Sequence, residues 1–170
     1  YDVDIIGMEP ALKVACDRGD NQRIAVWATE LTLSEKKFAD LMNRFKDEHH
    51  IMKVPCPKLV RMVEDDKLDD TNLVESVLKE YLVACDYKNL DSIVLGCTHF
   101  PFYTKYLERL CPNIHIIEGS VGTTLHTKDL LEQKGLLNMS DEIGSITWMN
   151  TMESKIELSK RLFKMLEVEA

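Results

Sequence analysis

Short apolar runs alternate along this chain with longer stretches in which apolar residues recur every three or four positions. Runs of four to eight apolar, β-branched residues are typical of buried strands, and the longer period is typical of amphipathic helices. The strand-like runs are residues 3–8, 23–28, 50–54, 92–96, 114–117 and 145–149. This alternation predicts βα units on a parallel sheet, and therefore a doubly wound α/β fold.

Capping residues and prolines predict where the helices begin. Ser, Asp and Asn accept hydrogen bonds from the first free N–H groups of a helix, and proline fits its first position. We expect helices over 10–17, 34–45, 57–65, 69–87, 120–133 and from 150 toward the end of the chain. The 69–87 helix carries one apolar face made of Leu73, Val74, Val77, Leu78 and Leu82. Such a face predicts a helix that packs on the sheet as scaffold.

The chemically distinctive stretch follows the strand run at 92–96. Cys97, Thr98 and His99 come directly after this run, and Pro101 predicts that a helix begins at once. Ligands of open α/β sheets bind beyond the carboxyl ends of the strands, where the N–H groups of a helix start attract anions. A helix terminus and a nearby imidazolium lower the pKa of a thiol, so Cys97 is a candidate base or nucleophile. The alternative is that Cys97 is a small buried hydrophobic residue, as free cysteines usually are.

The residues around this turn resemble a known family. Residues 95–101, Leu-Gly-Cys-Thr-His-Phe-Pro, resemble the second catalytic-cysteine motif of the glutamate racemases, cofactor-independent enzymes of the aspartate/glutamate racemase superfamily. Residues 6–11, 28–32 and 56–64 are similar, in the same order, to the family's Gly-x-x-Glu-Pro, Thr-x-x-Thr and Cys-Pro-x-x-Val…Glu segments. The resemblance covers about 5–119 and continues more weakly to the end of the chain.

The resemblance implies a two-lobe α/β enzyme that interconverts L- and D-glutamate for peptidoglycan biosynthesis in the cytoplasm. It implies proton transfer between two cysteines on opposite faces of the substrate, with no cofactor and no metal. On the matching positions it assigns catalysis to Cys97, His99 and Glu64. It assigns substrate binding to His99 and to the three threonines Thr98, Thr29 and Thr32. The histidine after Thr98 favours the glutamate over the aspartate branch of the superfamily, which has an acidic residue there.

Each of these assignments has a plainer alternative. A carboxylate such as Glu64 would hold the tautomer of His99 and raise its pKa, but Glu64 also precedes two aspartates, which is typical of a solvated helix end. Thr98 offers a hydroxyl and an N–H group to a substrate carboxylate, yet threonine is also a common helix cap. Thr29 and Thr32 lie just past a strand, at the edge where ligands bind, and caps and turns use threonine equally.

Two motifs of the family are absent from this sequence: an Asp-Ser-Gly segment and the Ala-Cys-Asn-Thr turn that carries the other catalytic cysteine. We therefore expect a partial enzyme whose start at Tyr1 is a cut edge. Residues 1–8 would be the edge of the first lobe, 9–119 the second lobe, and 120–170 a segment that returns to the first lobe. Two alternatives stay open: another member of the superfamily, or a non-catalytic lobe that serves only binding or assembly.

Composition narrows the function classes. A net charge of −8 argues against nucleic acid and anionic membranes as partners, because both need clustered Lys and Arg. No apolar run approaches 18 residues, so we expect a soluble, cytoplasmic protein. The apolar face of the last helix, within 158–166, favours a homodimer or aggregation where nothing covers it.

The remaining cysteines and histidines predict no metal or disulfide chemistry. The five cysteines are irregularly spaced and form no Cys-x-x-Cys pair, which argues against a disulfide framework and a zinc site. Four cysteines lack the glycine, hydroxyl and imidazole setting and are expected to be structural: Cys16, Cys56, Cys85 and Cys111. Four histidines without the spacing of metal ligands are expected on the surface or in the core: His49, His50, His115 and His126.

Overall fold

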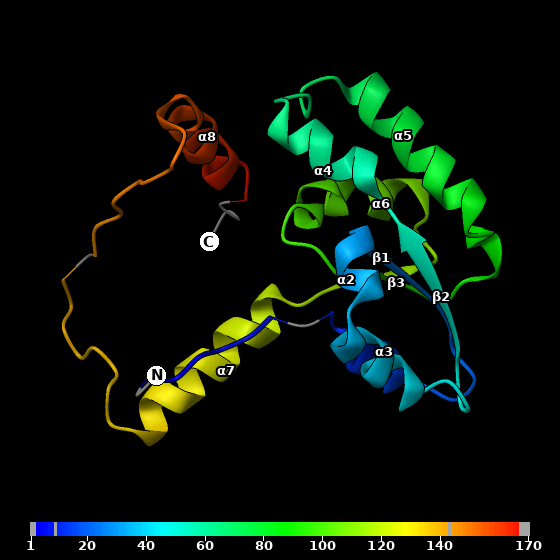
Figure 1. The fold of residues 1–170 in the computed structure, drawn as a ribbon, viewed down its shortest axis with the longest axis horizontal. Coiled ribbons are helices and arrows are strands. Elements are labelled where there is room, and N and C mark those ends of the chain that lie inside the picture. Colours follow the sequence, from blue (N-terminus) through cyan, green and yellow to red (C-terminus); the bar gives the residue numbers. More distant parts are fainter. Residues whose placement is uncertain (1–2, 9, 143, 167–170) are drawn as a thin grey trace. The chain divides into compact units, whose positions relative to one another are not determined.

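The computed structural model describes residues 3–8, 10–142 and 144–166 (Figure 1). The chain divides into two compact units, Tyr1–Thr123 and Thr124–Ala170, and each is described by itself. The first unit contains a parallel sheet of four strands, β1 (Arg23–Ala28), β2 (His50–Pro55), β3 (Ser92–Leu95) and β4 (His115–Glu118). The strand order is β2-β1-β3-β4, so β1 and β3 are the inner strands.

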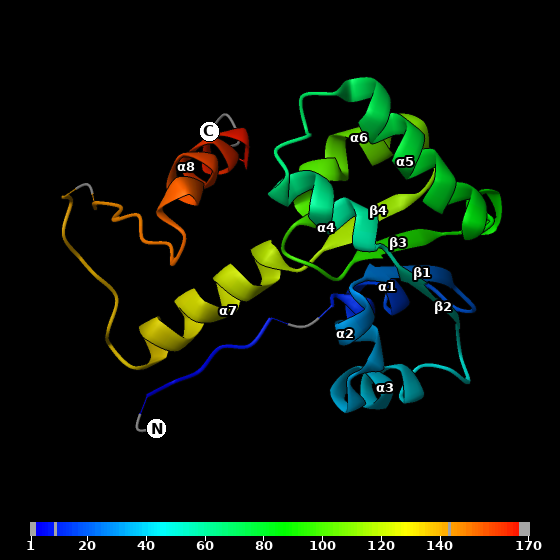
Figure 2. The same cartoon turned by 45° about the horizontal axis from the view of Figure 1, so that its top comes forward.

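Helices cover both faces of this sheet (Figure 2). One face carries α1 (Leu12–Cys16), α2 (Glu30–Ser34) and α3 (Lys36–Asn43). The other face carries α4 (Pro57–Glu64), α5 (Thr71–Ala84) and α6 (Thr104–Leu110). The predicted doubly wound α/β fold is therefore confirmed.

Alternate residues of β1 enter the two cores, as a strand covered on both faces requires. Val26 packs in one core with Leu12 of α1 and Phe38 of α3. The Trp27 side chain points the other way, and its ring lies 5.7 Å from the ring of Tyr81 on α5. This burial on both faces explains why the run reads as continuously apolar rather than alternating.

Two predicted strands are wrong. Residues 3–8 and 145–149 have no strand structure. A strand is stable only when a neighbouring strand pairs with its N–H and C=O groups, and neither segment has such a partner in the part of the chain that the structure describes.

The predicted helix 34–45 corresponds to α3, which is two residues shorter at each end, and the short helix α2 before it was not predicted. Thr29 caps α2: its side-chain oxygen accepts a hydrogen bond from the Thr32 N–H at 3.2 Å. Ser34 is the last residue of α2, where its hydroxyl donates to the Leu31 carbonyl at 2.8 Å, and is not a cap. Glu35 is extended, with φ −67° and ψ 141°, and this separates α2 from α3.

Other helix boundaries are confirmed or shifted by a turn. Pro57 opens α4 as predicted, and the Asp70 carboxylate caps α5 by accepting from the Leu73 N–H at 3.0 Å. Pro101 does not open an α-helix directly, because a 3₁₀ turn (Phe100–Tyr103) comes first and α6 follows it. Leu73 was expected on the buried face of α5 but is 39% exposed.

The end of the first unit and the second unit are mainly helical. The helix α7 (Ser120–Gln133) has its predicted bounds, and Gly135 follows it with φ +64°, a conformation that favours glycine. A 3₁₀ turn (Glu153–Lys155) precedes α8 (Ile156–Leu166), so the predicted start of this helix at Asn150 is too early. Phe163 of α8 packs edge-on against the ring of Trp148 at 5.4 Å. Within the described residues no helix is long and apolar enough to cross a membrane.

Gly96 directly follows β3, at a point where neighbouring atoms leave little room for a side chain. Its N–H donates to the Trp27 carbonyl at 2.8 Å, which continues the pairing with β1 by one residue. A Cβ atom at this position would lie 3.2 Å from Cγ of Pro10 and 3.3 Å from both Cβ of Ala28 and the Trp27 oxygen. The absence of a side chain therefore lets the chain turn at the end of β3.

We predict that Gly96→Ala lowers the free energy of unfolding by about 1–3 kcal/mol, the usual cost of overpacking, because strand backbone cannot move away from the new methyl group. Urea unfolding followed by circular dichroism measures this. Gly122→Ala in α7 is the control, since a Cβ there meets nothing within 4 Å. The control should be neutral or stabilising, and equal losses in both variants would contradict the packing argument.

Candidate functional site

The turn between β3 and the Phe100–Tyr103 segment carries the predicted thiol. Cys97 is half-buried there, at the carboxyl end of an inner strand, as the sequence predicts. Phe100 is fully buried just after it, and its N–H donates to the Cys97 carbonyl at 3.0 Å. The Tyr103 hydroxyl donates to the Leu59 carbonyl at 2.7 Å, which ties the segment to α4. These anchors fix the turn and leave the thiol accessible.

The structure brings the three predicted catalytic residues into one connected line. Sγ of Cys97 lies 3.7 Å from Nδ1 of His99, and Nε2 of His99 lies 2.7 Å from Oε1 of Glu64. Glu64 is the last residue of α4, and its side chain is 54% exposed against 27% for His99. Since each ring nitrogen of the histidine faces one partner, the carboxylate fixes the orientation of the imidazole toward the thiol.

The line of contacts shifts both pKa values toward a thiolate–imidazolium pair. Burial acts to raise the pKa of Cys97, but the side-chain and backbone hydrogen bonds with His99 lower it by more, so the net shift is downward from 9.0. The hydrogen bond with Cys97 raises the pKa of His99 to about 9; burial opposes this shift and the bond with Glu64 adds to it. The imidazole therefore keeps its proton at neutral pH, where it stabilises a negative charge on the thiol.

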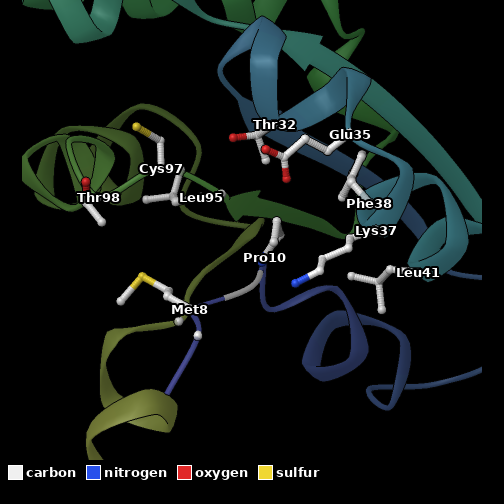
Figure 3. Close-up of a pocket in the computed structure, with 13 residues that line it drawn as sticks. Met8, Pro10, Thr32, Glu35, Lys37, Phe38, Leu41, Leu95, Cys97 and Thr98 are labelled. Atoms are coloured by element: carbon white, nitrogen blue, oxygen red, sulfur yellow. The ribbon is translucent and has the colours of Figure 1, made fainter. Parts of the chain in front are cut away.

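A cavity of about 360 Å³ opens beside the thiol. Cys97 and Thr98 line one side of it, and another side is lined by Thr32 of α2, Glu35 between the two helices and Lys37 of α3 (Figure 3). All of these residues belong to the Tyr1–Thr123 unit. The cavity is large enough for an amino acid and offers it a thiol, two hydroxyls and two opposite charges.

The predicted threonines have different surroundings. Thr98 is exposed and lines the cavity next to Cys97. Thr32 also lines the cavity, whereas Thr29 is not among the lining residues and has its Oγ1 3.0 Å from Oγ1 of Thr32. Thr29 thus has the plainer structural contact, as the cap of α2.

The sequence reasoning missed Glu35 and Lys37. In the sequence they belong to the run Glu-Lys-Lys, which is typical of a solvated helix start. Their place on the cavity wall depends on the extended conformation of Glu35, and no sequence motif predicts this conformation. Only the fold shows that this break faces the end of β3.

The other four cysteines, which the sequence predicts to be structural, are buried. Burial is the main cause that raises the pKa of each of them, to about 11 for Cys16 and Cys111. The thiols of Cys56 and Cys85 donate to backbone carbonyls at 3.3 and 3.4 Å. They remain neutral and closed to reagents, so Cys97 differs from them in both access and charge.

Metal ligands do not gather in the described ranges: no three His, Cys, Asp or Glu side chains there are placed to hold a metal ion. His49, the most buried of the other histidines, accepts a hydrogen bond on Nδ1 from the Gln22 N–H at 3.1 Å. That contact gives it a structural place in the loop before β2.

A polarised thiol at the carboxyl end of an inner parallel strand, beside an amino-acid-sized cavity, defines a class of α/β proteins with a reactive thiol at the ligand-binding edge of the sheet. Relatives identify the family within that class. The glutamate racemase of Bifidobacterium animalis subsp. lactis is 48% identical over 169 residues, which are 96% of this chain and 66% of that protein. The glutamate racemase of Bifidobacterium adolescentis is 51% identical over 154 residues, 89% of this chain and 60% of that protein.

Solved structures agree with this likeness. A glutamate racemase isoform from Bacillus anthracis superposes with a TM-score of 0.76 at 22% identity, over 96% of this chain and 62% of that one. A glutamate racemase from Francisella tularensis, in complex with D-glutamate, has a TM-score of 0.61 at 27% identity, over 71% of this chain and 45% of that one. No protein-family model matches the sequence.

This chain belongs to the glutamate racemase family. It spans 60–66% of the length of the two Bifidobacterium relatives.

We predict that iodoacetamide alkylates Cys97 alone among the five cysteines, with a rate that titrates below the ordinary thiol pKa of 9.0. His99→Asn should move the midpoint upward, because the lowering hydrogen bonds are lost. Mass spectrometry of the digested protein as a function of pH measures both effects. His126→Asn, an exposed histidine on α7, is the control and should leave the midpoint unchanged. A midpoint that His99→Asn does not move would contradict the pairing.

Proposed function

We propose that this chain is the part of a glutamate racemase that supplies one of two catalytic thiols. The whole enzyme would interconvert L- and D-glutamate for peptidoglycan biosynthesis, without a cofactor. The observation that carries the proposal is the contact of Cys97 with His99, and of His99 with Glu64, in a chain about half identical to named glutamate racemases. The proposal includes a cytoplasmic location, where free thiols persist.

Inversion at the α-carbon needs a base on one face of the substrate and an acid on the other. In one direction the Cys97 thiolate takes the α-proton, and a second group delivers a proton to the opposite face. In the other direction the neutral Cys97 thiol is the donor. A thiol suits both tasks because a modest pKa shift changes its state, and each unit corresponds to about 1.4 kcal/mol.

His99 and Glu64 prepare the thiol for this exchange. With its pKa raised to about 9, the imidazole is protonated before the substrate arrives, and its positive charge favours the thiolate. Glu64 holds the ring so that Nδ1 faces the sulfur. Both residues polarise Cys97, and neither lines the cavity that would hold the α-carbon.

The threonines and the turn would hold the substrate carboxylate. Thr98 offers a hydroxyl at the cavity wall, and Thr32 offers another from the opposite side. Hydrogen bonds aimed at the carboxylate also stabilise the negative charge that develops when the α-proton leaves. Thr29 supports this indirectly, because it positions the Thr32 hydroxyl.

Two other functions remain for experiment to separate. Another reaction of the same superfamily would use the same thiol on a different amino acid. A non-catalytic role in binding or assembly, with homodimer formation as one form of it, would not need Cys97. Loss of activity in a Cys97 variant, together with the identity of the substrate, distinguishes these three.

We predict that the full-length gene product exchanges the α-hydrogen of glutamate with deuterated water and that Cys97→Ser abolishes the exchange. An alcohol is a much weaker acid than a thiol, so the serine would almost never be ionised at neutral pH. Mass spectrometry of each enantiomer measures the exchange separately. Cys111→Ser is the control: this thiol is buried and donates to the Leu107 carbonyl at 2.9 Å, and serine can keep that bond. Undiminished exchange from both enantiomers in Cys97→Ser would refute the assignment.

We predict that residues 1–170 alone do not racemise glutamate measurably, even when folded. The four other thiols are buried and neutral, so none can act opposite Cys97. An open face would also admit water, which weakens electrostatic stabilisation of the carbanion. A racemase assay on the purified chain, with circular dichroism as the folding control, tests this. Turnover by a monodisperse monomer would mean that a second base lies within this sequence.

A further inference from the structure

One buried titratable side chain close to Cys97 has no role in the mechanism above. Tyr103 is the last residue of the 3₁₀ turn after Cys97, its side chain is fully buried, and its hydroxyl donates to the Leu59 carbonyl of α4 at 2.7 Å. Burial is the main cause that raises the pKa of Tyr103 well above its ordinary value, and a negative charge at Cys97 adds to this shift. The hydroxyl therefore stays a donor at every pH at which the thiol can act.

This hydrogen bond and the contact of His99 with Glu64 connect the same two segments of the chain. The two bonds join residues that are 44 and 35 positions apart in the sequence. On the turn, His99 comes directly before the segment that ends at Tyr103. On α4, Leu59 lies in the first turn of the helix and Glu64 is its last residue. The two bonds thus hold α4 against the turn at two points, near its start and at its end.

The two points differ in burial. Tyr103 and Leu59 are both 0% exposed, whereas the side chain of Glu64 is 54% exposed and that of His99 is 27% exposed. An exposed ionic contact gains little, because water screens it and both side chains lose rotamer freedom. A buried hydrogen bond costs more to break, because no water replaces the lost partner. The buried bond therefore sets the position of α4, and the exposed contact depends on that position.

The helix α4 needs such a bond because it does not follow the strand that carries the thiol. It follows β2, whereas His99 follows β3, and β1 lies between these two strands. Adjacent strands are about 4.8 Å apart, so the two segments leave the sheet roughly 10 Å from each other. The Tyr81 hydroxyl of α5 accepts from the Lys58 N–H at 3.3 Å and ties α4 to another helix. The Tyr103 hydroxyl comes from the segment that carries the site.

We propose that Tyr103 is a positioning residue for the thiol: its hydroxyl sets the place of α4 so that the Glu64 carboxylate reaches Nε2 of His99. This rests on the role of Glu64 and His99 in the proposed function and extends it to a residue that acts through them. Without the hydroxyl, the end of α4 can move away from the turn, which lengthens the 2.7 Å contact of Glu64 with His99. Cys97 and Glu64 are the titratable groups that act on His99, so this movement changes the proton affinity of the imidazole.

The pKa of His99 tests this without substrate. It is measured on the 170-residue chain by NMR of the imidazole ring as a function of pH. We expect Tyr103→Phe, which keeps the ring and removes the hydroxyl, to lower this pKa from about 9 by roughly half a unit. That is about a threefold loss of proton affinity, as the modest strength of an exposed contact implies. Tyr106→Phe on α6 is the control, because the Tyr106 hydroxyl bonds no described residue, and it should leave the pKa unchanged.

A double-mutant cycle shows whether the hydroxyl acts through Glu64. Glu64→Gln should lower the pKa of His99 by at least as much as Tyr103→Phe, and the double variant should lower it no further. Glu64→Asp, which retracts the carboxylate on an exposed helix end, should resemble Tyr103→Phe. This variant keeps the proposal open to refutation even if Tyr103→Phe does not fold. A pKa that Glu64→Asp leaves unchanged means that the placement of α4 has no effect on the imidazole.

The outcomes separate this inference from the function on which it rests. A Tyr103→Phe chain that is less stable to urea but keeps the pKa of His99 has lost only a structural bond, and the role of Tyr103 is overturned. Falls in pKa of equal size with and without Glu64 overturn it as well. If Glu64→Gln itself leaves the pKa unchanged, the proposed role of Glu64 fails together with that of Tyr103, while the assignment of Cys97 depends on its own test.

Discussion

The inner position of β3 in the sheet determines where the residues of this site can lie. β1 and β4 pair with it on both sides and its four residues are buried, so of the strand's side chains only that of Leu95, at its carboxyl end, lines the cavity. The chain becomes available to solvent only where the pairing ends, at Gly96, against Pro10 and the backbone of β1. Cys97 and His99 come directly after this point, and the cavity lies beside them. The pairing of β3 with β1 and β4 therefore determines where the turn begins and where the thiol lies.

The buried strands could be predicted because burial on both faces leaves a continuous apolar run, which turns and surface helices do not share. The same pattern failed at 3–8 and 145–149 because a run of apolar residues does not reveal whether a partner strand is present. The split between α2 and α3 was missed for a local reason. The sequence offers two hydroxyl caps, Thr29 and Ser34, and only the conformation of the backbone shows that the first one begins the helix.

The sequence alone predicted those residues of the site that lie close to one another along the chain. Cys97 and His99 are two residues apart, and their chemistry is visible in a single motif. Glu64 lies 35 residues before His99, and only the resemblance to the racemases pointed to it. The wall residues Glu35 and Lys37 carried no signal, because charged residues at a helix start are usually solvated. The pattern of residues along the chain does not show which βα units lie next to each other in the fold.

The thiol and the opposite wall belong to different segments, one after β3 and the other between β1 and β2. No covalent geometry couples the position of Lys37 to that of Cys97, and Lys53 holds the wall through its hydrogen bond to the Leu33 carbonyl and its contact with the Phe38 ring. The position of the thiol and the position of the facing wall are thus set by separate contacts. Within this architecture a substitution on the wall can alter the shape and charge of the cavity without moving the turn that carries Cys97.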